Sequence, residues 1–254
     1  MRPVISIITV TKNDAPGLLA TLESIAKQTY RNIEYIVIDG GNDKRSASAV
    51  SKYRPIVSYY TRAPDNGIYD AMNRGLNRAS GEFVCFINAG DCLYSRDTLQ
   101  LVADSIDQEV DVVFGEVMFV DKNHRDLGLR SQVTTQQLPQ KLTWRSMEFG
   151  MVVSHQGFYA RKALAPAYIK DNLCADIDWV IRILKSSRRN VRVNEPLAKF
   201  AVGGTSTRRF RRAMWDRFKV LSKHFGMVRT IFNHVSIIAR RALFRVRARF
   251  GNLA

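Results

Sequence analysis

The sequence is poor in cysteine and contains no long uninterrupted apolar run. Its three cysteines, Cys85, Cys92 and Cys174, show no Cys-x-x-Cys spacing, which disfavours a disulfide framework or a zinc site and favours core packing in a reducing compartment. No segment approaches the ~20 apolar residues of a membrane span, and the N-terminal MRPVISIITV lacks the apolar stretch and cleavage site of a signal peptide. These absences predict a protein that is made and retained in the cytoplasm.

Two common nucleotide-binding motifs are also missing. No Gly-x-Gly-x-x-Gly follows the first apolar run, residues 4–10, and the chain has no Walker A sequence, so dinucleotide and P-loop sites are unsupported. The run instead ends in polar residues that include Thr9, Thr11 and Asn13. These side chains either meet a nucleotide or only begin a helix, with Asn13 or Asp14 as its cap.

Short apolar runs alternate with helical patterns along the chain. With 254 residues, 46% of them hydrophobic, the protein is long enough for one sizeable core. Strand, helix, strand at this spacing predicts right-handed βαβ units in an α/β fold, with a mostly parallel sheet flanked by helices. A polar, poorly patterned span runs from residue 121 to about 143. We expect strands at 4–10, 33–38, 56–60, 83–87, 112–120 and 191–200.

The stretch from Asp65 to Asp91 has the most distinctive pattern. Turn residues are followed by an amphipathic helical pattern over 68–79 and then by a continuously apolar run, 83–87, which predicts a strand covered on both faces. That strand ends in the sequence NAGD. Because open α/β sheets bind ligands beyond the carboxyl ends of their strands, we expect Asp91 to face a ligand, unless it only caps the following helix.

This stretch also carries a resemblance. DNGIYDAMNRG followed by FINAGD is similar to the signature of family 2 glycosyltransferases with the GT-A fold, particularly bacterial members of the colanic-acid type that build exopolysaccharides and glycolipids. Further matches extend it from about Val4 to Ser206. The resemblance implies a Rossmann-like GT-A catalytic domain over 1–207, with a nucleotide-sugar-binding half, 1–110, and an acceptor half, 111–207.

The resemblance assigns residues to a nucleotide-diphosphate sugar, a UDP- or GDP-sugar. The segment DGGND, which begins at Asp39, is similar to the family's V-D-D-G-S-x-D segment, whose first Asp accepts a hydrogen bond from the nucleobase. Here Gly40 replaces the second acid. Asp65 and Asp70 either orient sugar and ribose hydroxyls or serve as a helix N-cap and a solvated residue. The predicted donor-binding set is Thr9, Thr11, Asn13, Asp39, Asp65, Gly67, Asp70, Asn73, Asn88, Ala89 and Gly90.

A divalent cation is the cofactor that the resemblance implies. Family members usually carry a D-x-D-like triplet at the end of the fourth strand, and this chain retains one acid there, Asp91. Asp91 is therefore predicted to bind Mn²⁺ or Mg²⁺, with the diphosphate and water as the other ligands. Such a hard cation stabilises the negative charge that develops on a diphosphate leaving group.

The acceptor half contains the predicted base. Residues His155 and Gln156 resemble the family's short "HQ" strand near the phosphates or acceptor. In CADIDW, the acids Asp176 and Asp178 cannot share one helix face, so one should point into the cleft while the other caps the helix or faces solvent. Similar family members place the catalytic carboxylate at the first position, so Asp176 is predicted to remove the acceptor hydroxyl's proton. Gly204, in a segment similar to the family's G-G-x-S, either closes over the donor or forms an ordinary turn.

The net charge of +16 is concentrated in the last part of the chain. From Arg208 to the end there are eleven Arg and two Lys against one acid, Asp216, so this part carries +12 and the other 207 residues only +4. Apolar residues recur there at helical spacing, which predicts a basic amphipathic helical extension, 208–254, that associates with an anionic membrane surface. The alternatives are that the apolar stripe packs on the catalytic domain, or that the tail binds nucleic acid, for which no recognition motif speaks.

The resemblance implies an inverting, metal-assisted glycosyltransferase that acts on a saccharide or lipid-linked acceptor, and the basic tail predicts that it is peripheral on the inner face of the plasma membrane. Two alternatives stay open. A nucleotidyltransferase has a similar sheet and metal site, and a basic membrane- or nucleic-acid-binding module could retain a degenerate domain of this kind.

Overall fold

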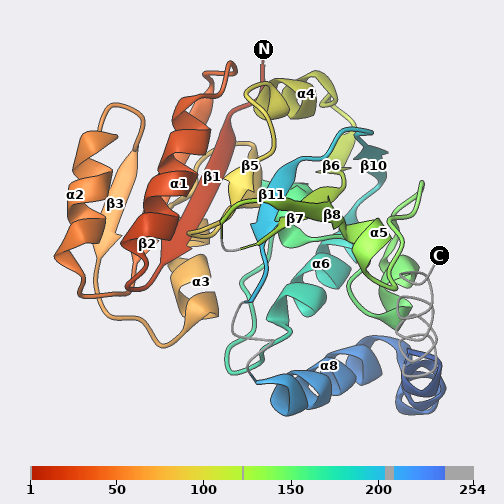
Figure 1. The fold of residues 1–254 in the computed structure, drawn as a ribbon. Coiled ribbons are helices and arrows are strands. Elements are labelled where there is room, and N and C mark those ends of the chain that lie inside the picture. Colours follow the sequence, from red (N-terminus) through yellow and green to blue (C-terminus); the bar gives the residue numbers. More distant parts are fainter. Residues whose placement is uncertain (1, 122, 204–208, 238–254) are drawn as a thin grey trace, which may run out of the picture.

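The computed structural model describes residues 2–121, 123–203 and 209–237 of the chain. Its largest element is a seven-stranded sheet with the order β10-β6-β9-β4-β1-β2-β3 (Figure 1). Neighbouring strands are parallel, except that β9 runs antiparallel to both β4 and β6. The mostly parallel α/β sheet is therefore confirmed. Its strands are β1 (Ile5–Thr11), β2 (Ile33–Asp39), β3 (Tyr59–Arg62), β4 (Phe83–Phe86), β6 (Val110–Phe114), β9 (Phe158–Arg161) and β10 (Arg189–Arg192).

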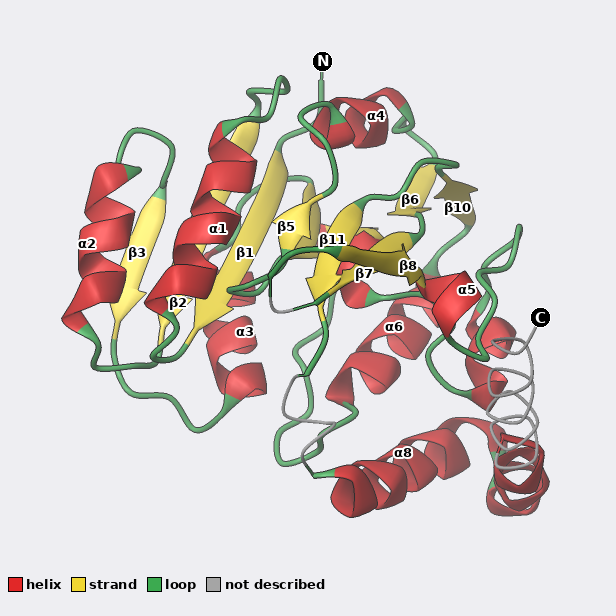
Figure 2. Ribbon diagram, in the orientation of Figure 1, coloured by secondary structure: helices red, strands yellow, loops and turns green. Residues whose placement is uncertain are grey.

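Helices cover both faces of this sheet (Figure 2). Because side chains alternate along a strand, Ile8 and Ile36 pack with α3, α6 and α8 on one face, whereas Ile7 and Val37 pack with α1, α2 and α4 on the other. The helices are α1 (Ala15–Ala26), α2 (Lys44–Lys52), α3 (Ile68–Arg78), α4 (Thr98–Asp104), α5 (Arg130–Val133), α6 (Ala175–Ser186) and α8 (Phe210–Phe225), with 3₁₀ turns at Trp144–Phe149, His155–Gly157 and Lys162–Leu164.

Asp14, and not Asn13, caps the helix that follows β1. Asp14 is the N-cap, and its Oδ1 accepts a hydrogen bond from the Gly17 N–H at 2.9 Å. Pro16 follows in the first turn, where its missing N–H removes no intrahelical hydrogen bond. Asp14 therefore begins the helix.

Two expected strands prove to be wrong as single elements. Residues 112–120 divide into β6 and β7 (Val117–Val120), and residues 191–200 divide into β10 and β11 (Ala198–Ala201). The second strand of each pair belongs to a smaller sheet of order β5-β11-β7-β8, with β5 at Cys92–Leu93 and β8 at Asp126–Leu129. At Gly115 the chain leaves β6. A Cβ there would lie 2.7 Å from Leu197 Cγ, so the backbone can pass this close to Leu197 only because glycine has no side chain.

The C-terminal region packs partly inward. Leu221 of α8 is fully buried in the core cluster that includes α6, and Phe225 stacks on Trp144 with ring centroids 5.4 Å apart. For α8 the apolar stripe therefore packs on the catalytic domain, and Figure 1 shows α8 beside α6. Gly226 ends α8 with a φ of 86°, and a further helix covers 227–237. Among the described residues, no helix has both the length and the apolar content to cross a membrane.

Candidate active site

A cavity of about 410 Å³ lies beyond the carboxyl end of β4. Asn88 follows that strand on one side of the cavity, and Asp176, in the first turn of α6, lies on another. The structure thus brings together residues 88 positions apart in the sequence. The other lining residues are Ile68, Tyr69, Phe119, Arg130, Met151, Ser154, His155, Gln156, Leu173 and Phe200.

The surroundings of Asp176 suit a proton acceptor. Its Oδ1 accepts hydrogen bonds from the Ile177 N–H at 2.9 Å and from the Tyr69 hydroxyl at 3.4 Å. Desolvation raises the pKa of Asp176 to about 6, so the carboxylate is ionised at neutral pH and is more basic than an exposed one. Burial also raises the pKa of Tyr69 well above its usual value, so this hydroxyl stays protonated and donates.

The expectation that the other acid of this turn caps the helix or faces solvent is wrong. Asp178 has no exposed surface, and its Oδ2 pairs with Arg182 Nε at 2.6 Å. Its Oδ1 contacts His224 Nε2 at 2.9 Å and Lys223 Nζ at 3.4 Å, both on α8. Although burial raises the pKa of Asp178, the hydrogen bond from His224 and the charges of Arg182 and Lys223 outweigh it and lower that pKa to about 2. Asp178 therefore joins α6 to α8.

At the strand end, Asn88 and His155 form a polar pair. Asn88 Nδ2 lies 3.2 Å from His155 Nε2, so the ring accepts the amide hydrogen when its own proton is on Nδ1. Burial lowers the pKa of His155 to about 4, which leaves the ring neutral at neutral pH. His155 can thus hydrogen-bond a phosphate but cannot neutralise its charge. Asn88 Oδ1 is buried and has no hydrogen-bond partner among the described residues.

Asp91 does not cap the following helix, whose N-cap is Asp97, and it does not line the cavity, contrary to the expectation that it faces a ligand. Its Oδ2 accepts a hydrogen bond from Gln156 Nε2 at 2.7 Å, and its Oδ1 accepts one from the Ala201 N–H at 3.1 Å. The side chain is only 4% exposed, and burial raises its pKa to about 7. Gln156 is in turn bonded to Ser154, so a chain of hydrogen bonds fixes the carboxylate.

The described part of the chain holds no group of three His, Cys, Asp or Glu side chains that could share a metal ion. The carboxylate of Asp91 and the unpartnered Oδ1 of Asn88 belong to one turn, in which the Asp91 N–H donates to the Asn88 carbonyl at 2.9 Å. Both are hard oxygen donors of the kind that Mg²⁺ and Mn²⁺ prefer. Both Asp91 oxygens already accept hydrogen bonds, so in this arrangement Asn88 Oδ1 is available to a cation, and Asp91 would join it only by giving up the contact with Gln156.

A second cluster forms where β1 and β2 end. Asp39 is fully buried, and its Oδ1 accepts the Gly41 N–H at 2.8 Å while its Oδ2 lies 3.4 Å from the Tyr60 hydroxyl. Asn13, with a φ of 56°, accepts the N–H groups of residues 42 and 43 through its Oδ1. Thr11 Oγ1 is buried without a hydrogen-bond partner in the described structure, which leaves it able to bond a ligand.

The structure explains why Gly40 stands where the family pattern has an acid. A Cβ at Gly40 would lie 1.4 Å from Asp65 Oδ2, so the Asp65 carboxylate already fills the space of a side chain there. Asp65 Oδ1 accepts the Gly67 N–H at 3.0 Å and pairs with Lys12 Nζ at 3.2 Å. The Asp65 carboxylate, from the turn before α3, therefore occupies the space that an acidic side chain at position 40 would fill.

Of the predicted donor-binding residues, only Asn88 lines the cavity, and two of the others have their polar groups used inside the fold. Thr9 is fully buried, and its Oγ1 donates to the Ile87 carbonyl at 2.7 Å. Asn73 bonds both the N–H and the carbonyl of Tyr168, at 2.7 and 2.9 Å, so its amide groups are used within the fold. In both cases the polar groups are consumed by contacts between elements, which corrects the prediction of a donor-binding role.

Four further predicted site residues make backbone or ion-pair contacts within the protein, and a fifth is outside the part of the chain that the structure describes. Asp70 is not simply solvated, because it pairs with Arg74 at 3.0 Å and with Lys170 at 3.5 Å beside a smaller cavity of about 170 Å³. Gly67 precedes α3 with a φ of 115°, a conformation that favours glycine. The Ala89 and Gly90 N–H groups donate to the Val10 carbonyl and to Thr21 Oγ1. Gly204 lies outside the described residues.

Two lining residues of the cavity, Tyr69 and Arg130, were not predicted from the sequence. Arg130 lines the cavity from α5, and its guanidinium donates to the carbonyls of Met151 and Val152, the latter at 2.8 Å. Burial lowers the pKa of Arg130 to about 10, so it stays charged at neutral pH. This residue belongs to the polar span without a clear pattern, so only its spatial position reveals it. Tyr69 stands in the DNGIYDAMNRG motif, where its position in the helix could have suggested a contact with the base.

The fold and the site define a class: the chain has the GT-A fold, with polar strand ends facing a helix-borne carboxylate. Residues 6–165 match the family model "Glycosyl transferase family 2", and the protein belongs to this family. A PGL/p-HBAD biosynthesis glycosyltransferase of Mycobacterium bovis (strain BCG / Pasteur 1173P2) is 33% identical over 189 residues, which cover 71% of this chain and 69% of the relative.

Solved structures show the same fold at low sequence identity. Staphylococcus aureus TarS 1-349 in complex with UDP-GlcNAc aligns with a TM-score of 0.68 and 18% identity, covering 94% of this chain and 72% of that one. The mannosyltransferase PcManGT from Pyrobaculum calidifontis, in complex with GDP-Man and Mn²⁺, aligns with a TM-score of 0.66 and 19% identity, covering 98% and 81%.

Proposed function

We propose that this family 2 glycosyltransferase is an inverting enzyme that moves one sugar from a nucleotide-diphosphate sugar to a hydroxyl of a saccharide or lipid-linked acceptor. The observation that carries the proposal is Asp176, a carboxylate with a pKa of about 6 on the wall of a cavity that begins at the end of β4. Asp176 takes the hydroxyl proton as the acceptor oxygen bonds to the anomeric carbon, and the bond from that carbon to the diphosphate oxygen breaks.

The donor occupies the strand-end side of this site. Buried polar groups of Thr11 and Asp39 meet the nucleoside, and Asn88 and His155 lie near the phosphates. This arrangement is supported by the unpartnered buried oxygens of Thr11 and Asn88, which a bound ligand would satisfy. Structural neighbours in complex with UDP-GlcNAc and with GDP-Man support a UDP- or GDP-sugar as the donor class.

A divalent cation, Mn²⁺ or Mg²⁺, is part of the proposed site. Asp91 would hold it, with Asn88 Oδ1 and the donor's diphosphate as further oxygen ligands. When bound, the cation neutralises charge on the leaving diphosphate. The chemistry of these oxygen donors and the Mn²⁺ in the PcManGT structure support this assignment.

The acceptor is proposed to belong to cell-surface polysaccharide or glycolipid synthesis, with the enzyme peripheral on the inner face of the plasma membrane. The helix at 227–237 supports this because its polar Thr230 and Asn233 are buried, whereas five apolar residues on other faces are 49–71% exposed. An exposed apolar face that is followed in the sequence by a strongly basic segment suits an anionic lipid surface. The exposed residues are Met227, Val228, Ile231, Phe232 and Val235.

Product analysis tests the proposed reaction. Purified protein is incubated with a panel of nucleotide sugars, Mn²⁺ or Mg²⁺ and a bacterial lipid extract as acceptor source. We expect release of a nucleoside diphosphate that depends on acceptor and on one or a few donors. Pyrophosphate release instead would identify a nucleotidyltransferase, and absence of donor binding across the panel would favour a non-catalytic module.

A further inference from the structure

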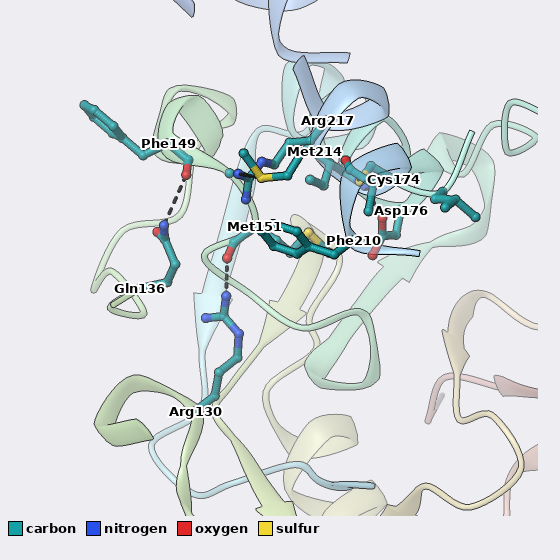
Figure 3. A pocket seen from close by; sticks show the side chains of 13 residues that line it. Arg130, Gln136, Phe149, Met151, Cys174, Asp176, Phe210, Met214 and Arg217 are labelled. Atoms are coloured by element: carbon teal, nitrogen blue, oxygen red, sulfur yellow. Dashed lines mark hydrogen bonds between the residues drawn. The ribbon is translucent and has the colours of Figure 1, made fainter. Parts of the chain in front are cut away.

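A second cavity, of about 290 Å³, also has Asp176 in its wall (Figure 3). It shares Arg130, Met151, Leu173 and Asp176 with the first cavity, so the two cavities are neighbours with Asp176 in both walls. Figure 3 shows Met214 and Arg217 entering from one side and Arg130 from the opposite side. The ring of Phe149 points away from the other labelled side chains, so this residue borders the cavity through its backbone.

The walls of this second cavity are mainly apolar. The apolar side chains come from three segments: Met151 precedes the 3₁₀ turn at His155–Gly157, Ile177 belongs to α6, and Phe210 and Met214 belong to α8. Arg130, Gln136 and Arg217 add polar groups to these walls. The first cavity also has apolar lining residues, but on its strand-end side it carries Asn88, Ser154, His155 and Gln156. Among the described lining residues, the second cavity therefore differs from the first in lacking the strand-end polar groups.

Polar contacts hold α8 against this site. The Leu173 N–H donates to Asp216 Oδ2 at 3.0 Å, and the Cys174 thiol contacts the Ala213 carbonyl at 3.3 Å. At the other end of the helix, His224 pairs with the fully buried Asp178. No site residue was predicted in α8, yet the first two turns of this helix form one wall of the cavity.

We propose that the second cavity binds the apolar aglycone, aryl or alkyl, of the acceptor and thereby holds the acceptor hydroxyl at Asp176. This inference rests on the proposed function, because a base must stand between donor and acceptor, and the polar side is assigned to the donor. Burial of about 60 Å² of apolar surface at ~25 cal/mol per Å² corresponds to about a tenfold gain in affinity. The aglycone, and not only the acceptor sugar, then determines specificity.

Matched acceptors test this proposal without membranes. Methyl, octyl and p-nitrophenyl glycosides of the same sugars are compared as acceptors for the wild-type protein. We expect KM to be at least about tenfold lower for the octyl or the p-nitrophenyl series than for the methyl series. The series with the lower KM shows whether the cavity prefers an alkyl or an aryl aglycone. Equal KM values for all three series would overturn the proposal.

Two variants of the same helix separate the cavity from a general effect of α8. Phe210 and Trp215 are both exposed aromatic residues, at 49% and 59%, but only Phe210 lines the cavity. Phe210→Ala is expected to reduce the aglycone preference at least fivefold, whereas Trp215→Ala retains it. Thermal unfolding checks that both variants are folded. An unchanged preference in folded Phe210→Ala, or an equal loss in both variants, contradicts the assignment.

Direct binding keeps this inference distinct from the proposed reaction. Calorimetry measures the affinity of the same glycosides without a donor. Preferential binding of the octyl or p-nitrophenyl glycosides that is weakened by Phe210→Ala, but without turnover, would uphold the cavity and reject the reaction. Turnover without such a binding preference would support the proposed reaction and reject the aglycone cavity.

Discussion

Two carboxylates in the first turn of α6 lie in opposite surroundings. Asp176 faces the two cavities, where desolvation raises its pKa to about 6 and the donated hydrogen bonds only partly offset that effect. Asp178 points to α8, where burial is outweighed by His224, Arg182 and Lys223, so its pKa falls to about 2. The comparison teaches that one turn of helix can present a carboxylate of raised pKa to a cavity and one of lowered pKa to a neighbouring helix.

The largest expected effect comes from replacing Asp176, the proposed base. Asp176→Asn keeps the shape of the side chain but cannot accept the acceptor proton, so kcat should fall by about 10²–10⁴-fold. Donor affinity measured by calorimetry should change little, because the base acts on the acceptor. Wild-type turnover by this variant would move the base elsewhere.

The structural partner should show the reverse behaviour. Asp178→Asn leaves Arg182 and Lys223 without their counter-charge and weakens the contact with His224, so the loss of unfolding free energy should be on the order of 2 kcal/mol. Denaturant unfolding measures this loss. Lys223→Gln is the matched control, because Lys223 is 60% exposed and should cost less than about 1 kcal/mol. Asp176→Asn should not destabilise the fold, since its ionised form is disfavoured by burial. Equal stability losses in the two aspartate variants would refute the contrast.

The pH dependence separates the same two residues. Transfer should rise with pH through about 6, because Asp176 must be ionised to act as a base. At about pH 5 the rate should be roughly tenfold below its plateau. Asp178 has a lowered pKa, so its contribution to stability is present above the unfolded value of about 3.9 and is lost as pH falls toward 2. The protein should therefore be folded but slow near pH 5, as circular dichroism beside an activity profile can establish.

The smallest expected effect concerns the hydroxyl that bonds the base. Tyr69→Phe removes the donor 3.4 Å from Asp176 Oδ1 and with it a contact that lowers the pKa of Asp176. The acidic limb of the activity profile should move to higher pH by less than about one unit. An acidic limb that stays in place or moves to lower pH would show that Tyr69 does not tune the base.

Much of the fold could be predicted because it follows from local periodicity. The apolar runs and the intervening helical patterns predicted the order of the first strands and helices, and the strand-end position of Asn88 followed from them. The family motif singled out Asp176 and Asp91. Local patterns could not reveal that residues 112–120 change sheets at Gly115, because an apolar run reads the same whether it serves one sheet or two.

The sequence by itself determined the alternating α/β pattern, the concentration of positive charge after Arg208 and the motif that contains Asp176. Only the tertiary structure decided that Asp65 fills the space beside Gly40, that Asp178 pairs with His224 and that α8 closes a cavity beside the base. The physical reason is range: periodicity and turn chemistry act over a few residues. These contacts join residues 25 or more positions apart, and they form only when packing of the core brings separate elements together.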